Sequence, residues 1–220
     1  MLQHEIQTQS FIDYFEGIKK IDTFSEIMKR AWVLGEEEGY LIPLTRCHLN
    51  SKPMIQLLAD WRSKNQDAYP TQFPVTLEGT SKWLDTQVVH NSKRVLFLVL
   101  SQEGWPIGHL GYNNMVWGEK RELEIDNVVR GEKDHQAGLM TVAMRTLLQQ
   151  THVLWKPDRI YLRVFHDNQH AVNFYKRLGF IFTKAIPLRK EIESDVIRFV
   201  PIENEKKADR IFDVMEWRRS

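Results

Sequence analysis

Residues 122–165 constrain the fold of this chain more than any other stretch. Residues 122–129 alternate polar and apolar side chains and then become wholly apolar, which predicts a strand entering a buried sheet. A polar turn at 130–136 follows, then a helical pattern to about His152 and a second strand at 159–165. Strand, helix and strand in this order predict a βαβ unit with a right-handed crossover. The core of the fold should therefore be a sheet that contains this unit.

The rest of the chain is predicted to add strands and helices around this unit. Periodicity and turn residues predict helices within 1–35, at 53–64, within 76–89 and at 168–178, and strands at 40–48, 94–101, 107–116, 180–188 and 211–217, with an optional strand at 197–201. Segments 65–77 and 203–209 are predicted to be loops. A chain of 220 residues is within the range of one domain. We therefore predict a helical extension at 1–35 and one domain at 36–220.

Residues 168–178 have the features of a short helix with defined ends. Asn168 can accept a hydrogen bond from the first turn, and Gly179 can adopt the left-handed conformation that ends a helix. Ala171, Phe174, Tyr175 and Leu178 are spaced at i, i+3, i+4 and i+7, so they share one face that should be buried. On this segment alone, Tyr175 is as well explained by core packing as by a chemical role.

The turn after the strand at 122–130 predicts an anion site. The first turn of the helix that follows has backbone N–H groups without helical partners, and the helix dipole is positive at that end. Gly138 lies at this junction and would let a ligand approach the backbone closely. A phosphate or pyrophosphate suits such a position.

Together, the turn at 130–140 and the segment 168–180 resemble the GNAT superfamily of N-acyltransferases, which use acetyl-CoA. The resemblance covers roughly residues 94–190. It implies an α/β (α+β) GNAT fold, with a central mixed, mostly antiparallel twisted sheet, a βαβ acyl-CoA-binding core and an N-terminal helical extension. At two positions of the family's phosphate-loop pattern this chain has His135 and Met140.

The resemblance also implies which residues bind acetyl-CoA as the cosubstrate. The pantetheine arm would contact the strand end, the pyrophosphate would contact the loop and the first helical turn, and the thioester would lie near the helix at 168–178. Carried over to this sequence, these residues are Val128, Val129 and Arg130 for pantetheine, Gln136, Ala137, Gly138, Leu139 and Met140 for pyrophosphate, and Asn168 and Tyr175 near the thioester.

Acetyl transfer to an amine needs a neutral amine, a polarised carbonyl and a proton for the leaving thiolate. Glu122, Glu124 and Asp126 alternate along the strand and share one face, where a carboxylate can take a proton or bind an ammonium group. We predict Glu124 as the base and Asp126 as an acceptor-binding residue, although these acids could equally be the polar face of a strand. Backbone N–H groups near Val128 would polarise the carbonyl, and Tyr175 would protonate the thiolate.

The pair Trp61-Arg62 resembles the acceptor-binding region of GNAT enzymes that modify amino sugars. There Trp61 would stack on a ring and Arg62 would bind a phosphate. The alternative is that Trp61 anchors the core and Arg62 forms a surface ion pair. Both readings remain open at the level of the sequence.

Composition narrows the choice of partners. Thirty Lys and Arg against 29 Asp and Glu leave a net charge of +1, which argues against nucleic acid or anionic lipid as a partner. The apolar run at 95–100 is too short to cross a bilayer, and residues near the N-terminus lack a secretory pattern, so we expect a cytoplasmic protein. The one cysteine and eight histidines show no metal-binding spacing, and no metal is predicted. A monomer or homodimer is expected.

Three functions follow from these observations. The first is an N-acetyltransferase that moves an acetyl group from acetyl-CoA to a small-molecule amine, such as an amino sugar or a nucleotide-linked amino sugar. The second is acetylation of a protein N-terminus, as in the branch that modifies ribosomal proteins. The third is a domain that binds acyl-CoA without turnover, as a sensor or interaction module, which the departures at His135 and Met140 keep open.

Overall fold

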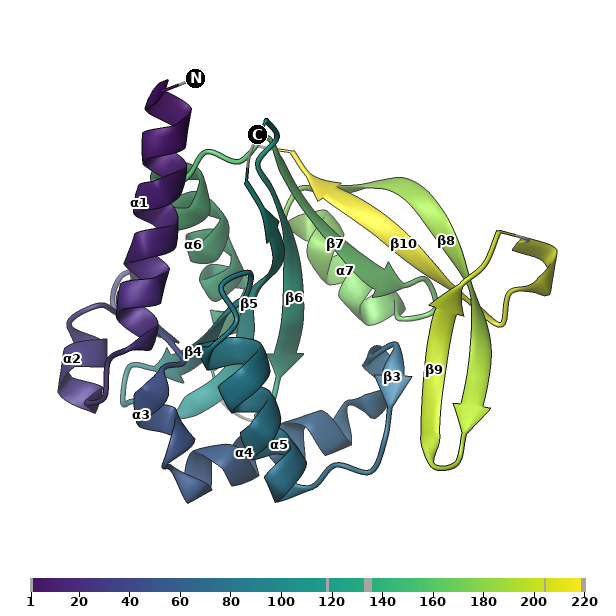
Figure 1. The fold of residues 1–220 in the computed structure, drawn as a ribbon, viewed down its shortest axis with the longest axis horizontal. Helices are drawn as coiled ribbons and strands as arrows, with labels where there is room; N and C mark the ends of the chain where they lie inside the picture. The colour runs from purple at the N-terminus through teal and green to yellow at the C-terminus, as the bar shows by residue number, and fades with distance from the viewer. Residues whose placement is uncertain (1, 118, 133–135, 204, 219–220) are drawn as a thin grey trace.

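The computed structural model describes residues 2–117, 119–132, 136–203 and 205–218, which form one mixed sheet with helices on its faces (Figure 1). The sheet order is β1-β2-β4-β5-β6-β7-β10-β8-β9-β3. The strands are β1 (Trp32–Leu34), β2 (Gly39–Pro43), β3 (Thr71–Gln72), β4 (Val95–Ser101), β5 (Pro106–Val116), β6 (Glu122–Arg130), β7 (Arg159–Phe165), β8 (Phe180–Glu193), β9 (Val196–Pro201) and β10 (Arg210–Trp217). The α-helices are α1 (Leu2–Lys19), α2 (Phe24–Met28), α3 (Arg46–Leu49), α4 (Lys52–Lys64), α5 (Leu77–Trp83), α6 (Leu139–Leu154) and α7 (Gln169–Arg177). η1 (Gln66–Ala68) and η3 (Glu205–Lys207) are short 3-10 helices, and η2 (Leu84–Val89) is a π-helical segment that follows α5 directly.

The predicted βαβ unit is present as β6, α6 and β7. β6 and β7 are parallel, whereas the other described strand pairs are antiparallel. The prediction of a mixed, mostly antiparallel sheet is therefore confirmed. Its one parallel pair lies at the centre of the molecule.

β6 and β7 separate after only three paired positions. Their register runs from Glu122 opposite Arg159 to Glu124 opposite Tyr161, and no pairing is described beyond that point. In Figure 1 the two strands part as they leave this contact. On its other side β6 carries a bulge against β5, where the register shifts and Asn127 has a positive φ of 52°. The sheet is therefore open along the second half of β6.

The core covers both faces of the sheet, because consecutive residues of a strand point to opposite faces. All seven residues of β4 are buried. Its alternate side chains fall into two clusters, one that contains Phe97 and one that contains Leu98. On the first face α1 and α6 pack, and the rings of Phe11 and Trp155 stack with centroids 4.8 Å apart. α3, α4 and η2 cover the second face with Trp61 at its centre.

Several segments differ from their predictions, among them the predicted loop at 203–209, which contains η3, and the strand predicted at 180–188, which continues to Glu193. The strand predicted at 40–48 ends at Pro43, because Thr45 caps α3 by accepting a hydrogen bond from the Cys47 N–H. The segment predicted as helical before residue 36 also contains β1. The predicted loop at 65–77 contains η1 and β3. These elements form because of a helix cap or a strand partner far away in the chain, and hydrophobic periodicity predicts neither.

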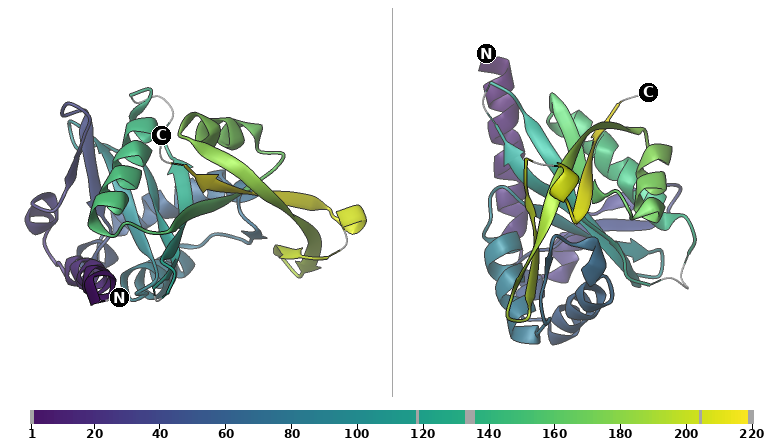
Figure 2. Two further views of the ribbon diagram at one scale, coloured as in Figure 1. Left: turned by 90° about the horizontal axis from the view of Figure 1, so that it is seen from above. Right: turned by 90° about the vertical axis from the view of Figure 1, so that its right-hand side faces the viewer.

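The long hairpin of β8 and β9 reaches back to the loop that carries β3. The left view of Figure 2 shows this hairpin extending beyond the rest of the sheet. Thr71 pairs with Arg198, and the Phe199 N–H donates to the Pro70 carbonyl at 2.7 Å. A segment late in the chain thereby fixes the position of residues 65–75. None of the described helices is long and apolar enough to cross a membrane.

Candidate active site

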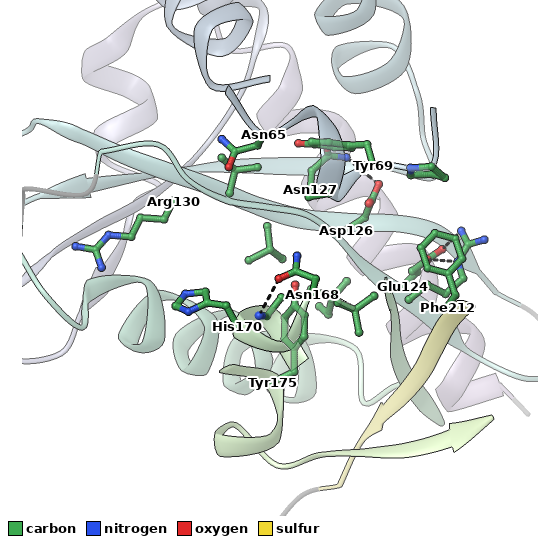
Figure 3. A pocket seen from close by; sticks show the side chains of 18 residues that line it. Asn65, Tyr69, Glu124, Asp126, Asn127, Arg130, Asn168, His170, Tyr175 and Phe212 are labelled. Atoms are coloured by element: carbon green, nitrogen blue, oxygen red, sulfur yellow. Dashed lines mark hydrogen bonds and ion pairs between the residues drawn. The ribbon is translucent and has the colours of Figure 1, made fainter. Parts of the chain in front are cut away.

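A cleft of about 550 Å³ lies where β6 and β7 part, and we call it the strand cleft. Figure 3 shows it from close by, with Asn168 and Tyr175 on the α7 side and Asp126 and Asn127 across from them. Its walls come from β6, β7, α7 and the loop at 65–70. The predicted residues that line it are Glu124, Asp126, Val128, Val129, Arg130, Asn168 and Tyr175.

The backbone of β6 forms the floor of the strand cleft. Since β6 has no described pairing with β7 beyond Glu124, its backbone groups on that side have no strand partner. Buried backbone N–H and C=O groups require partners. An extended ligand that carries amide groups can complete this edge as an additional strand would. The pantetheine arm of coenzyme A has that chemistry, which fits the predicted contacts at Val128, Val129 and Arg130.

The N-terminus of α6 has the features of an anion site. Gly138 stands at the N-cap with φ of 91°, and a side chain built there would meet no atom within 4 Å. The first turn of α6 contains no acidic residue. Gln136, Ala137 and Gly138 are exposed, whereas Leu139 and Met140 are buried, so these two can contribute only backbone groups. This turn does not line the strand cleft. His135 lies outside the described residues.

Tyr175 projects from α7 into the strand cleft. Asn168 caps this helix by accepting a hydrogen bond from the Ala171 N–H at 3.2 Å, as predicted. The Tyr175 side chain is 8% exposed, and burial raises its pKa above the ordinary value, with the charge of Asp126 adding to the effect. The phenol is therefore protonated at neutral pH, and it can donate its proton or a hydrogen bond as well as accept a hydrogen bond at its oxygen.

Glu124 is held in a buried ion pair. Arg163 contacts both carboxylate oxygens, with Nε 2.6 Å from Oε1 and Nη2 3.0 Å from Oε2. Asn114 donates a further hydrogen bond to Oε2 at 2.7 Å. The Glu124 side chain is 4% exposed. Both carboxylate oxygens are therefore engaged by cationic or amide donors in a buried position, which weakens the prediction of Glu124 as the base.

Asp126 is the more accessible carboxylate of the predicted acidic face. Its Oδ2 lies 3.4 Å from Arg94 Nη2 and 2.7 Å from Asn127 Nδ2, and the side chain is 33% exposed. Both contacts use the same oxygen. Asp126 can therefore face a ligand with its other oxygen.

A second hollow of about 310 Å³ adjoins the strand cleft, and we call it the aromatic cavity. Tyr69, Phe73 and Trp83 supply its aromatic surface. The two hollows share five wall residues, which are Tyr69, Pro70, Asp126, Asn127 and Arg163. A ligand in one hollow can therefore meet a ligand in the other at Asp126.

The two residues of the Trp61-Arg62 pair differ in their relation to the aromatic cavity, since Arg62 lines it and Trp61 does not. Trp61 is fully buried, donates from Nε1 to Glu132 at 2.9 Å and lines neither hollow, so its geometry matches the core-anchor alternative. Arg62 does line the aromatic cavity. Its Nη2 donates to the Thr71 carbonyl at 2.7 Å, and its guanidinium carbon lies 3.3 Å from the centre of the Tyr69 ring.

His109 supports the wall between the hollows. Its Nδ1 lies 2.6 Å from the carbonyl oxygen of Asn127, at the bulge of β6. Burial lowers the pKa of His109 to about 4. The ring is therefore neutral at pH 7, and its Nδ1–H donates to the bulge.

Arg210 fastens the outer wall of the aromatic cavity. It forms two hydrogen bonds with the Asp167 carboxylate, at 2.9 and 2.7 Å, and a third with the Asp67 carbonyl at 3.0 Å. Its guanidinium carbon lies 3.5 Å from the centre of the Phe165 ring. One side chain of β10 thus ties the loop that carries β3 to the region before α7.

Several wall residues were not singled out by the sequence, including Arg94, Arg163, Tyr69 and Phe73. Arg163 carried a signal, since Arg159, Tyr161 and Arg163 alternate along β7 and share one face. Tyr69 and Phe73 carried none, because they lie in an irregular segment whose position depends on β9. Within the described part of the chain, no group of three or more His, Cys, Asp or Glu could hold a metal ion.

Comparison with known families and structures gives consistent matches. A model described as an acetyltransferase (GNAT) domain matches residues 40–181. The spermine/spermidine N(1)-acetyltransferase of Bacillus subtilis (strain 168) is 32% identical over 79 residues, which are 36% of this chain and 47% of that protein. The chain thus spans about half the length of that relative.

Solved structures share the fold. A ribosomal L7/L12 alpha-N-protein acetyltransferase matches with a TM-score of 0.64 at 14% identity, over 84% of this chain and 93% of that one, and its complex with coenzyme A also matches with a TM-score of 0.64. A probable acetyltransferase of the same family from Chromobacterium violaceum matches with a TM-score of 0.60 at 22% identity, over 84% of each chain. The predicted fold class is confirmed.

Proposed function

The chain belongs to the GNAT acetyltransferase family, whose model covers residues 40–181, and we propose that it transfers the acetyl group of acetyl-CoA directly to the primary amine of a small molecule. The predicted acyltransferase class and cosubstrate are confirmed at the level of the family, which uses acetyl-CoA. One observation carries the proposal for this chain. The strand cleft and the aromatic cavity meet at Asp126, so a donor in one faces an acceptor in the other.

The strand cleft fits acetyl-CoA, which when bound would supply the thioester that is cleaved. The open edge of β6 would bind the pantetheine arm, and the first turn of α6 would bind the pyrophosphate. A backbone N–H near Val128 or Val129 would donate to the carbonyl oxygen of the thioester. These contacts are made by the backbone and by the shape of the cleft.

Asp126 is the carboxylate that we assign to the amine. It lines both hollows and is partly exposed, whereas Glu124 is enclosed by Arg163 and Asn114. Asp126 would bind the incoming ammonium and accept its proton directly or through water. Glu124 would then hold Arg163 in position, and its predicted role as the base would require that ion pair to open.

Tyr175 is assigned the proton for the departing thiolate. The phenol is a weaker acid than a thiol in water, and burial raises its pKa further. Its contribution therefore depends on close placement rather than on matched acidity.

The acceptor is proposed to be small. A cavity of about 310 Å³ suits a drug-sized molecule or less, and its aromatic walls with Arg62 suit an amino sugar or a nucleotide-linked amino sugar. The relative in Bacillus subtilis is described as a spermine/spermidine acetyltransferase, and the solved neighbour as a protein acetyltransferase. A protein N-terminus remains the alternative acceptor, and acyl-CoA binding without turnover remains the alternative from another class.

The first test is calorimetric titration of the protein with acetyl-CoA and, separately, with free coenzyme A. Micromolar binding of both is expected, followed by thiol release when a suitable amine is added. Binding without thiol release for any amine or peptide would favour the non-catalytic alternative. Absence of binding would refute the assignment of the strand cleft.

The choice between the carboxylates needs paired variants. Asp126→Asn is expected to lower the rate of thiol release at saturating amine, whereas Glu124→Gln should act chiefly on stability by leaving Arg163 without its partner. Thermal midpoints measured alongside the rates separate the two effects. A large rate loss in Glu124→Gln, with Asp126→Asn unchanged, would restore Glu124 as the base.

A further inference from the structure

The charges around the aromatic cavity do not balance. Among the described residues that line it, Arg62, Arg94 and Arg163 are cationic and Asp126 is the one carboxylate. Arg163 is neutralised by Glu124, which lies outside the cavity wall, and Arg94 is within 3.4 Å of Asp126. Arg62 forms no ion pair within 4 Å among the described residues, and the charge of Asp126, which is already paired with Arg94, acts on it from a longer distance. The wall therefore carries one positive charge in excess, and it is located at Arg62.

Arg62 has a hydrogen-bond donor for which the described residues provide no acceptor. Its Nη2 is occupied by the Thr71 carbonyl, whereas its Nη1 is buried and has no hydrogen-bond partner among the described residues. A buried cation without a counter-ion is costly. Burial also raises the pKa of Tyr69 to about 12, so the phenol beside Arg62 stays neutral and cannot serve as that counter-ion.

The surroundings of Arg62 limit the shape of its ligand. Its flat face packs on Tyr69, and Phe73 lies 5.2 Å from its guanidinium carbon. This packing holds the planar group at a fixed angle at the cavity wall, where an N–H group without a partner can donate to a carboxylate or phosphate. Leu58, Val75 and Trp83 supply an apolar surface for the rest of the ligand.

We propose that the aromatic cavity selects an amine that also carries an acid group, a carboxylate or a phosphate, on an apolar or ring-shaped body, and that Arg62 binds the acid group while Asp126 faces the amine. This specificity rests on the proposed acetyl transfer. Carboxylate and phosphate share the chemistry that Arg62 recognises. The structure assigns the anion, and the experiment below distinguishes its two sources.

Polyamines have the opposite charge pattern. Spermidine carries several ammonium groups, and each would need a carboxylate or a similar acceptor in a desolvated site. The described wall offers Asp126 alone and three guanidinium groups. This chain should therefore discriminate against the acceptors for which its relative in Bacillus subtilis is named.

The test compares amines in matched pairs, after coenzyme A binding has been measured by calorimetry. One panel contains the amino acids and their amides, a second contains hexosamines and their 6-phosphates, and spermidine is added to both. Thiol release gives kcat/KM for each amine. The best acid-bearing amine is expected to exceed its neutral counterpart at least tenfold, and the panel in which this occurs identifies the acid as carboxylate or phosphate.

Variants at one position connect this preference to its proposed cause. Arg62→Gln should remove the preference for the acid-bearing member, whereas Arg62→Lys, which keeps the charge, should retain part of it. The affinity for coenzyme A, measured for each variant, shows whether the fold and the strand cleft are intact. A general loss of stability would lower both members of a pair and leave their ratio unchanged. The wild-type ratio does not depend on the folding of either variant.

The outcomes separate this inference from the proposed function. Turnover of neutral amines or spermidine in preference to every acid-bearing amine would overturn the inference and leave acetyl transfer standing. Binding of coenzyme A without turnover of any acid-bearing amine would also overturn it. Failure to bind coenzyme A or acetyl-CoA would remove the proposed function and this specificity with it.

Discussion

The two hollows that meet at Asp126 are built in different ways. The strand cleft has the open backbone edge of β6 beyond Glu124 as its floor, and the first turn of α6, with Gly138 at its N-cap, lies outside its walls. The aromatic cavity consists of side chains, and its outer wall is held in place by β9, which lies beyond the matched residues 40–181. The path of the backbone can form a binding site for a cosubstrate that a whole family shares, whereas a binding site for one particular acceptor depends on the identity of its side chains.

The largest effect is expected from Tyr175→Phe, which tests whether the strand cleft contributes a side chain to the chemistry. Removing a general acid lowers rates by about 100-fold or more. We therefore expect kcat for thiol release to fall by about 100-fold while the affinity for coenzyme A is unchanged. An unaltered kcat would return Tyr175 to the role of a packing residue, and the strand cleft would then act through backbone alone.

Gly138→Glu tests the proposed phosphate site at the first turn of α6. The substitution places a side chain at φ of 91° and a negative charge at the positive end of α6. The dissociation constant of coenzyme A should rise at least tenfold, which corresponds to about 1.4 kcal/mol. Gly138→Ala carries the same backbone strain without the charge, so the difference between the variants gives the electrostatic part. Equal affinity in Gly138→Glu and the wild type would refute the placement of the phosphates.

Arg210→Ala tests whether the aromatic cavity depends on its fastened wall. Loss of the contacts with Asp167 and Asp67 should loosen the loop that carries Tyr69 and Phe73. The KM for the best amine is expected to rise about fivefold, or about 1 kcal/mol, with coenzyme A affinity unchanged. Arg189→Ala, which removes an exposed ion pair with Glu191 on β8, is the matched control and should change neither. An equal rise of KM in both variants would show that Arg210 does not hold the wall of the aromatic cavity in place.

The last prediction concerns stability rather than activity, and it is a dependence on pH that arises at the wall between the hollows. The pKa of His109 is lowered from 6.5 to about 4 in the folded protein, so below pH 6.5 the unfolded chain binds the proton more tightly. Stability should therefore be complete above pH 6.5 and fall as the pH drops to about 4, by about 2 kcal/mol at pH 5. His48 has a similarly lowered pKa and should contribute an equal share.

The measurement is the thermal midpoint at pH 7 and pH 5. For a chain of this size, the share from His109 corresponds to roughly 5 °C. His109→Gln and His48→Gln should each reduce the pH-dependent fall by its own share. An identical fall in the wild type and both variants would show that other groups control the acid response.

The sequence predicted the features that nearby residues determine, and it did not predict those that depend on distant segments. β6 and β7 were predicted because each has its own alternation of side chains, and β4 was predicted from a continuous apolar run that a turn follows; Asn168 and Gly179 mark the ends of α7 locally. The open edge of β6 could be expected only through the family resemblance. Arg62 was identified as a candidate, but its unpaired charge was not, because that depends on where Glu124 and Asp126 find their cations.

The pairing of β3 with β9 has a consequence for the order in which the molecule assembles. Contacts between segments distant in the chain form late in folding, because a long loop must close first. β6, α6 and β7 are consecutive in the chain and can associate early. Thr71 must wait for Arg198, which is synthesised long after it. The wall that we assign to substrate selection is therefore expected to be the last part of the site to form.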